Sequence, residues 1–117
     1  MTKDSPSIFS KIIDREIPAD IVADTETLIA FRDVAPKAPV HLLVVPKTDR
    51  YATVAELAAA DPRLLAEMVA MAQSLATEHA GGDFRLVFNS GADAGQTVFH
   101  VHAHVLAGTL GEETLAG

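Results

Sequence analysis

The sequence predicts an α+β fold, in which helices pack on one face of a five-stranded sheet. Its apolar residues recur at helical and strand-like spacings in the order helix, three strands, helix, two strands. Neither an internal repeat nor a linker divides the chain. A length of 117 residues, of which 49% are hydrophobic and 21% charged, suits one folded domain rather than a disordered chain. We therefore expect a single domain over residues 1–117.

The first expected element is a short helix. Ser5 and Pro6 are typical of an N-cap and a first helical position. The apolar side chains of residues 8–13 then recur at helical spacing, which predicts one apolar face. Pro18 is expected to end this helix, because proline cannot continue the hydrogen-bonding pattern.

Three strands are expected next. Residues 21–23 and 27–31 are strand-like runs separated by three polar residues, which indicates a hairpin. Residues 41–45 form an almost continuous apolar run between Pro39 and Pro46. Such a run is typical of a central strand that is buried on both faces.

The second half of the chain predicts one long helix and two strands. Residues 61–62 form a cap-and-proline pair, and the apolar stripe of residues 64–76 predicts the longest helix. The glycines at 81–82 should end it. Residues 84–88 and 98–107 have the composition of the last two strands.

Charge and composition exclude several classes of function. The net charge is −7 and no basic stripe is present, which argues against a nucleic-acid partner. The chain has no cysteine, so it can form neither a disulfide nor a thiolate metal site. It also has no signal-peptide pattern and no apolar run long enough to span a membrane. We therefore expect a soluble, cytoplasmic protein with no membrane contact.

Three of the five histidines alternate along the last predicted strand, at His100, His102 and His104. Side chains at alternate positions of a strand point to the same face. The spacing therefore predicts that the three imidazoles line one side of the sheet. Three histidines in register favour a functional site over a structural role, because imidazole serves in catalysis and in metal binding.

Two kinds of site fit this pattern. A metal site would take two ligands from the alternating histidines and a third from His41. However, no acidic residue lies within or directly beside them in the sequence, and Asp93 lies seven residues before His100. A metal-free site would use one histidine as a nucleophile and its neighbours as acids, bases or donors. Asn89 and the glycine-rich residues 91–97 favour this second site, because neutral donors can hold phosphoryl oxygens.

Residues 100–107 resemble the signature of the histidine triad (HIT) family, His-φ-His-φ-His-φ-φ, in which φ is apolar. The resemblance extends in order over about residues 7–108, which leaves residues 109–117 as a C-terminal tail. Further segments are similar to the nucleotide-binding branch of the family. They are residues 8–13, 16–19, 30–33, 38–41, 45–47, 89 and 95–97.

The resemblance implies an antiparallel five-stranded sheet that pairs with a second copy into a ten-stranded sheet, forming a homodimer. It implies a hydrolase that binds a purine nucleoside monophosphate or phosphoramidate and acts on the α-phosphate. Cleavage would pass through a covalent nucleotidyl-histidine, with no metal and no cofactor. A dinucleoside polyphosphate hydrolase of the same superfamily and a nucleotide-binding regulatory module are the alternatives.

The resemblance also implies a role for each residue of the motif. His102 would be the nucleophile, His100 would orient it, and His104 would donate to a phosphate oxygen. His41 would join the proton relay to the leaving group. The phosphate would be held by Asn89, Gly95, Gln96 and Thr97, together with His102 and His104. The base and ribose would contact Ile8, Phe9, Ile12, Phe31, Asp33 and Val34, although the apolar members of this set equally fit a plain core.

The sequence departs from the family pattern at two places. Ser7 and Ser10 stand where many bacterial relatives carry a Cys-x-x-Cys zinc pair. Hydroxyls are poor zinc ligands, so we expect no structural zinc. Residues 106–109 lack the Leu-Gly-Gly-Arg continuation, and the chain has no tryptophan for the usual tail. The resemblance therefore leaves the preferred leaving group open.

Overall fold

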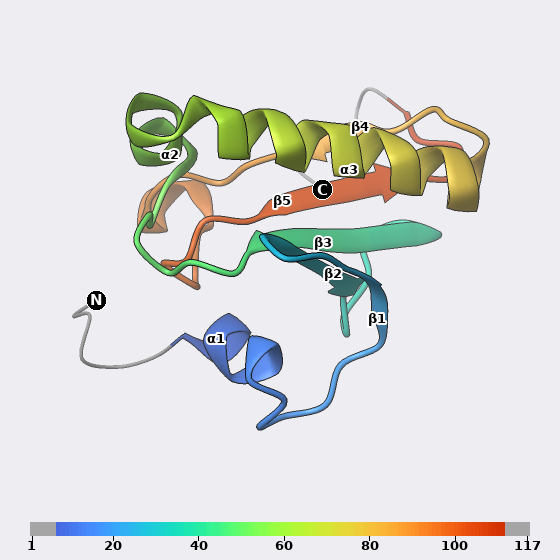
Figure 1. Cartoon of the computed structure of the whole chain (residues 1–117). Coiled ribbons are helices and arrows are strands. Elements are labelled where there is room, and N and C mark those ends of the chain that lie inside the picture. The colour runs from blue at the N-terminus through green and yellow to red at the C-terminus, as the bar shows by residue number, and fades with distance from the viewer. Residues whose placement is uncertain (1–6, 112–117) are drawn as a thin grey trace.

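Five antiparallel strands form one sheet in the order β1-β2-β3-β5-β4 in the computed structural model, which describes residues 7–111 (Figure 1). This confirms the predicted five-stranded antiparallel sheet. The strands are β1 (Ile21–Asp24), β2 (Leu28–Arg32), β3 (Val40–Pro46), β4 (Arg85–Val87) and β5 (Ala103–Ala107). The helices are α1 (Ile8–Ile13), α2 (Val54–Ala60) and α3 (Pro62–Ala80), and the 3₁₀ turn η1 (Ala92–Ala94) precedes β5.

Strand β3 lies at the centre of the sheet. Its Val44 pairs with Ala30 of β2 on one side and with Ala103 of β5 on the other. All side chains from Leu42 to Val45 are buried. An apolar run without alternation needs cover on both faces of a sheet, and β3 has that cover.

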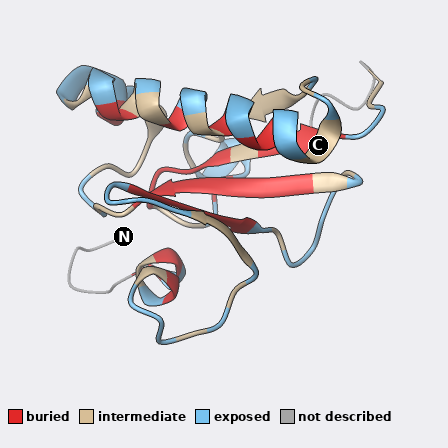
Figure 2. Ribbon diagram, turned by 45° about the vertical axis from the view of Figure 1, so that its right-hand side comes forward, coloured by how far each residue is buried: buried red, intermediate tan, exposed pale blue. Residues whose placement is uncertain are grey.

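Helices cover both faces of the sheet (Figures 1 and 2). Helix α3 packs on one face, as predicted, together with α2, through a cluster that includes Leu42, Leu57 and Met68. The short helix α1 packs on the opposite face through Phe9 and Ile12, so the prediction of helices on one face alone missed α1. None of the helices within residues 7–111 is long and apolar enough to cross a bilayer.

Helix α1 begins and ends at other residues than predicted. Its N-cap is Ser7, whose side chain accepts a hydrogen bond from the Ser10 N–H at 3.0 Å. Ser5 and Pro6, predicted as cap and first residue, lie outside the described residues. The helix ends at Ile13, well before Pro18, because backbone amides after it bond back to carbonyls of its last turn.

The second half of the chain confirms one prediction and corrects two. Helix α3 has Asp61 as its N-cap, proline at its first position and a left-handed glycine as its C-cap. The preceding helix α2 was not predicted, because its alanine-rich segment has little amphipathic pattern. The strand predicted over residues 98–107 starts only at Ala103. Before Ala103 the backbone forms hydrogen bonds outside the sheet; the Val101 N–H, for example, donates to the Tyr51 carbonyl.

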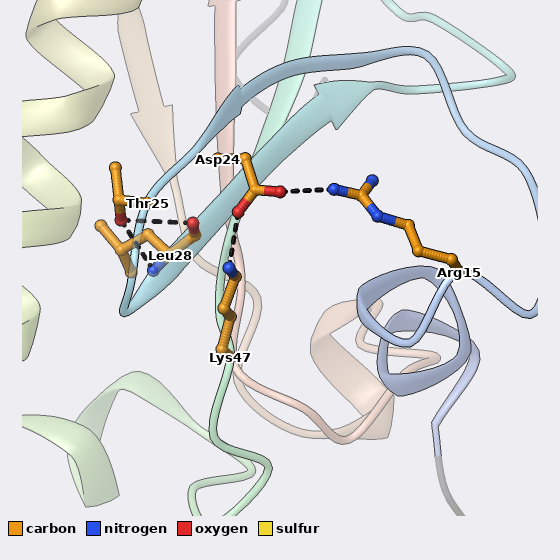
Figure 3. Close-up of polar contacts among 5 residues, drawn as sticks. All are labelled: Arg15, Asp24, Thr25, Leu28 and Lys47. Carbon is orange, nitrogen blue, oxygen red and sulfur yellow. Dashed lines mark hydrogen bonds and ion pairs between the residues drawn. The ribbon is translucent and has the colours of Figure 1, made fainter.

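An ion-pair cluster ties α1 to the edge of the sheet (Figure 3). Asp24 of β1 bonds to Lys47 after β3 and to Arg15 after α1. Hydrogen bonding to Lys47, together with the charges of both cations, lowers the pKa of Asp24. The Thr25 hydroxyl closes the β1–β2 turn through bonds to both backbone groups of Leu28. These contacts hold the hairpin and the end of α1 in one place.

Candidate active site

A cavity of about 270 Å³ opens beside the histidines, on the sheet face that carries α1. Seven of the residues predicted for the site line it, together with Ala35, Lys37 and Leu106. The seven are Asp33, His41, Asn89, Gly95, Thr97, His102 and His104. Two larger hollows, of about 490 and 360 Å³, contain no histidine. Chemistry rather than size therefore identifies this cavity as the candidate site.

The pairing of β3 with β5 brings His41 and His104 together. His41 lies opposite Leu106 and Leu43 opposite His104, so the two histidines are diagonal neighbours on one face. His41 Nε2 lies 2.9 Å from His104 Nδ1. The two residues are 63 positions apart in the sequence, and the register of the sheet alone makes them partners.

His100 and His102 precede β5, so the three histidines do not share one regular strand as predicted. The rings of His102 and His104 are nevertheless in contact, with centroids 5.1 Å apart. His102 Nδ1 lies 2.8 Å from the carbonyl oxygen of His100. Since a carbonyl only accepts hydrogen bonds, Nδ1 of His102 carries the proton and its Nε2 keeps a lone pair.

The same reasoning assigns the protons of the other two cavity histidines. The backbone N–H of Lys37 donates to His41 Nδ1 at 3.0 Å, so the proton of neutral His41 lies on Nε2. His41 Nε2–H then donates to His104 Nδ1, which leaves the His104 proton on Nε2. The cavity thus combines an unprotonated nitrogen on His102 with an N–H donor on His104.

Burial keeps these imidazoles neutral. Desolvation is the largest cause that lowers the pKa of His41, His100 and His102 below the ordinary value. Desolvation and the neighbouring His102 and His41 lower the pKa of His104 to about 4. A neutral imidazole can act as a nucleophile near pH 7, whereas an imidazolium cannot.

These depressed pKa values predict how stability depends on pH. Between the folded pKa of His104, about 4, and the ordinary histidine value of 6.5, the unfolded chain binds more protons than the folded one. We therefore expect the free energy of unfolding to rise as the pH rises from about 4 to 6.5, and then to level off. Urea titrations across this range measure the effect, and a smaller rise in His104→Gln would assign part of it to His104. A stability that falls with rising pH in this window would contradict the assignment.

Asp33 lies next to the histidine pair, although no acidic residue lies beside His100, His102 and His104 in the sequence. One carboxylate oxygen accepts from the Ala35 N–H at 2.8 Å, and the other lies 3.5 Å from His41 Nε2. Within residues 7–111, Asp33, His41 and His104 place ligand-type atoms within 4.8 Å of one another. A metal would require a lone pair on His41 Nε2 and a proton on Nδ1, facing the Lys37 N–H donor. This hydrogen bond disfavours a metal at these three residues.

The glycine-rich loop before β5 forms the opposite wall of the cavity. Asn89 Nδ2 donates to the Ala94 carbonyl at 2.9 Å and lines the cavity beside Gly95 and Thr97. Gln96, predicted to bind phosphate, is buried and does not line the cavity. Its side chain bonds to three backbone groups, at Gly91, Ala52 and Val98. The structure places Gln96 as a support of the loop.

Gly95→Ala is expected to weaken both the loop and nucleotide binding. Gly95 has φ = 92°, and a Cβ there would lie 2.9 Å from Asn89 Nδ2. We expect a loss of about 1–2 kcal/mol of stability from the left-handed backbone, together with displacement of the Asn89 amide. Gly81→Ala is the matched control, since Gly81 is also left-handed, with φ = 75°, but lies outside the cavity, and a Cβ there meets nothing within 4 Å. Calorimetry with AMP should show weaker binding for Gly95→Ala, and equal affinities for the two variants would refute a role for the Asn89 amide.

The residues predicted to contact the base do not line the cavity. Phe9, Ile12 and Phe31 are buried together between α1 and the sheet, while Ile8 is 51% and Val34 99% exposed. The Phe9 ring packs edge-on against His102, with centroids 4.8 Å apart. The structure thus places the aromatic core of α1 directly against the candidate nucleophile.

Sequence reasoning missed two groups that organise the site. The Lys37 N–H fixes the proton of His41, and the Ser7 hydroxyl lies 2.7 Å from His100 Nδ1. The Lys37 N–H could not be predicted, because every residue except proline has a backbone N–H and the sequence does not show which of them will point at a histidine. Ser7 was considered only as a substitute for a zinc-binding cysteine.

Comparison with known proteins agrees with this geometry. The HIT domain model matches residues 14–110. An uncharacterized HIT-like protein of Synechocystis sp. is 49% identical over 106 residues, which cover 87% of this chain and 90% of that protein. Purine nucleoside phosphoramidase of Escherichia coli (strain K12) is 40% identical over 104 residues, 87% of each chain. The crystal structure of a HIT family hydrolase from Legionella pneumophila Philadelphia 1 superposes with a TM-score of 0.84 at 39% identity, covering 90% of this chain and 95% of that one. By sequence and by fold, this chain belongs to the HIT domain family.

Proposed function

We propose that this protein is a nucleotide-binding hydrolase that cleaves purine nucleoside phosphoramidates through a nucleotidyl-histidine on His102. The observation that carries the proposal is the bond from His102 Nδ1–H to the His100 carbonyl, which leaves Nε2 unprotonated. Both His102 and the N–H donor His104 line the same cavity. The 40% identity to the Escherichia coli phosphoramidase supports the choice of substrate class.

In the proposed reaction, His102 Nε2 attacks the α-phosphorus and the P–N bond breaks. An anionic phosphate in the cavity favours the protonated form of the His41–His104 pair, so substrate binding brings in one proton from solvent. The pair gives this proton to the departing amine. Water then attacks the nucleotidyl-histidine, and its proton returns to His104, which releases the nucleoside monophosphate and free His102.

The remaining cavity residues take binding roles in this proposal. Asn89, Gly95 and Thr97 hold the phosphate oxygens, and Asp33 accepts hydrogen bonds from the ribose hydroxyls. The base lies against the apolar residues of α1 and β2, with Ile8 and Val34 at the exposed rim. Because Phe9, Ile12 and Phe31 are buried in the structure, α1 has to shift for the base to reach them.

Lys37 favours one second candidate. It is a cation in the lining of the cavity, where a charged ammonium can stabilise the further phosphates of a polyphosphate leaving group. This arrangement would suit a dinucleoside polyphosphate hydrolase with the same nucleophile.

Turnover of adenosine phosphoramidate and of diadenosine polyphosphates separates the two activities. We expect a higher kcat/KM for the phosphoramidate, with AMP and the free amine as products. Faster cleavage of the diadenosine compounds would favour the second candidate. Binding of AMP without turnover of either substrate would instead indicate a nucleotide-binding module.

We further propose that the protein forms a homodimer. Strand β4 is an edge strand of three residues, and the exposed residues of α3 from Ala66 to Thr77 carry no charge. An uncharged helix face and a short edge strand fit an isologous interface. Sedimentation should give a dimer mass at micromolar concentration, and a monomer there would refute the proposal.

A further inference from the structure

Ser7 joins the start of α1 to the loop that carries the candidate nucleophile. Its side chain is buried, with only 5% of the residue exposed. Its Oγ accepts a hydrogen bond from the Ser10 N–H at 3.0 Å and lies 2.7 Å from His100 Nδ1. Ser7 and His100 are 93 positions apart in the sequence.

The direction of the Ser7–His100 bond follows from the other side of the ring. His100 Nε2 lies 2.8 Å from the carbonyl oxygen of Pro46, which can only accept. The proton of neutral His100 is therefore on Nε2, and its Nδ1 carries a lone pair. The Ser7 hydroxyl has two possible acceptors, His100 Nδ1 at 2.7 Å and Ser10 Oγ at 3.4 Å, and the shorter distance assigns its proton to Nδ1. Its oxygen accepts from the Ser10 N–H, and a hydroxyl is the side-chain group that can do both.

The fixed His100 in turn holds His102. The carbonyl of His100 accepts the Nδ1–H of His102 at 2.8 Å, which leaves Nε2 of His102 for attack. Phe9, in the first turn of α1, packs edge-on against both rings, with centroids 5.9 Å from His100 and 4.8 Å from His102. Ser7 thus acts on His102 by two routes, through the His100 backbone and through the placement of Phe9.

We propose that Ser7 is a positioning residue, whose hydroxyl locks His100 in its Nε2–H form and fixes α1 against His102. The inference rests on the proposed function for its kinetic consequence, whereas the state of the His100 ring can be measured without any substrate. Ser7 touches no reacting atom in this scheme.

Three substitutions separate this role from simple helix capping. Ser7→Thr keeps both the acceptor and the hydroxyl donor. Ser7→Asp keeps the acceptor for the Ser10 N–H, and aspartate is a good N-cap, but a carboxylate cannot donate to His100 Nδ1. Ser7→Ala loses both. Lys11→Ala is the matched control, since Lys11 is an exposed residue of the same helix and alanine keeps its backbone N–H, which donates to the Ser7 carbonyl.

The experiment combines ¹⁵N NMR of the His100 ring, thermal unfolding, and kcat and KM for adenosine phosphoramidate. We expect Ser7→Thr and Lys11→Ala to match the wild type. Ser7→Asp should keep a near-normal Tm, show protons on both nitrogens of His100, and lose about tenfold in kcat with a smaller change in KM, as the loss of about one hydrogen bond predicts. Ser7→Ala should lose both Tm and kcat.

A wild-type His100 spectrum and wild-type kcat in Ser7→Asp would overturn the proposal, because capping alone would then explain Ser7. A changed His100 spectrum with unchanged kcat would overturn the link to His102. If the wild-type protein hydrolyses no phosphoramidate, the proposed function fails, while the NMR comparison still decides whether Ser7 sets the state of His100.

Discussion

His102→Ala is expected to lower kcat for adenosine phosphoramidate by at least about 10³–10⁴-fold. The variant lacks the imidazole whose Nε2 is left unprotonated by the hydrogen bond from Nδ1–H to the His100 carbonyl. It keeps Asn89, Gly95 and Thr97 in the cavity wall, so the affinity for AMP should change far less. Steady-state hydrolysis and calorimetry with AMP measure the two effects separately.

His79→Ala is the matched control, because His79 lies in the last turn of α3 and does not line the cavity. It should keep wild-type kinetics. If His102→Ala retains more than about a tenth of the wild-type kcat, His102 is not the nucleophile. The histidines would then have to be reinterpreted as a binding or metal site.

Leu42→Ala is expected to reduce the free energy of unfolding by about 2–5 kcal/mol. Leu42 is fully buried in β3, where it pairs with Arg32 of β2 and Val105 of β5. Its truncation leaves a cavity in the core between the sheet and the helices α2 and α3. Urea denaturation at constant pH measures the loss.

Val34→Ala provides the comparison, since Val34 is 99% exposed and its truncation should change stability by less than about 0.5 kcal/mol. Equal effects at the two positions would contradict the central place of β3 in the core.

The sequence predicted those parts of the fold that local chemistry determines. The apolar run of β3 and the Asp61–Pro62 start of α3 are local signals, and both elements lie where they were predicted. Helix α2 also has a local signal, the capping box of Thr53 and Glu56, but its alanine-rich segment lacks an apolar stripe and it was missed. Asp61 serves both as its C-cap and as the N-cap of α3. The start of β5 depends on where distant backbone groups, such as the Tyr51 carbonyl, accept hydrogen bonds.

In the candidate site, too, some features follow from the local sequence and others only from the assembled fold. The alternation of His102 and His104 is visible in the sequence, and the two rings do meet. The bond between His41 and His104 depends on the register of β3 against β5, which no local pattern specifies. The positions of Asp33 beside His41 and of Gln96 inside the loop likewise depend on the assembled fold.

The strand order has a consequence for the synthesis of the chain on the ribosome. Strands β1, β2 and β3 are consecutive and can pair as soon as they emerge, but β5 inserts between β3 and β4 only after the long excursion through α2 and α3. Until then β3 lacks its second neighbour, β4 lacks the strand with which it pairs, and His41 lacks its partner His104. A nascent chain that ends before Ala103 thus carries three paired strands and lacks the contact between His41 and His104. Within residues 7–111, the last strand completes the sheet and brings His41 and His104 together in one step.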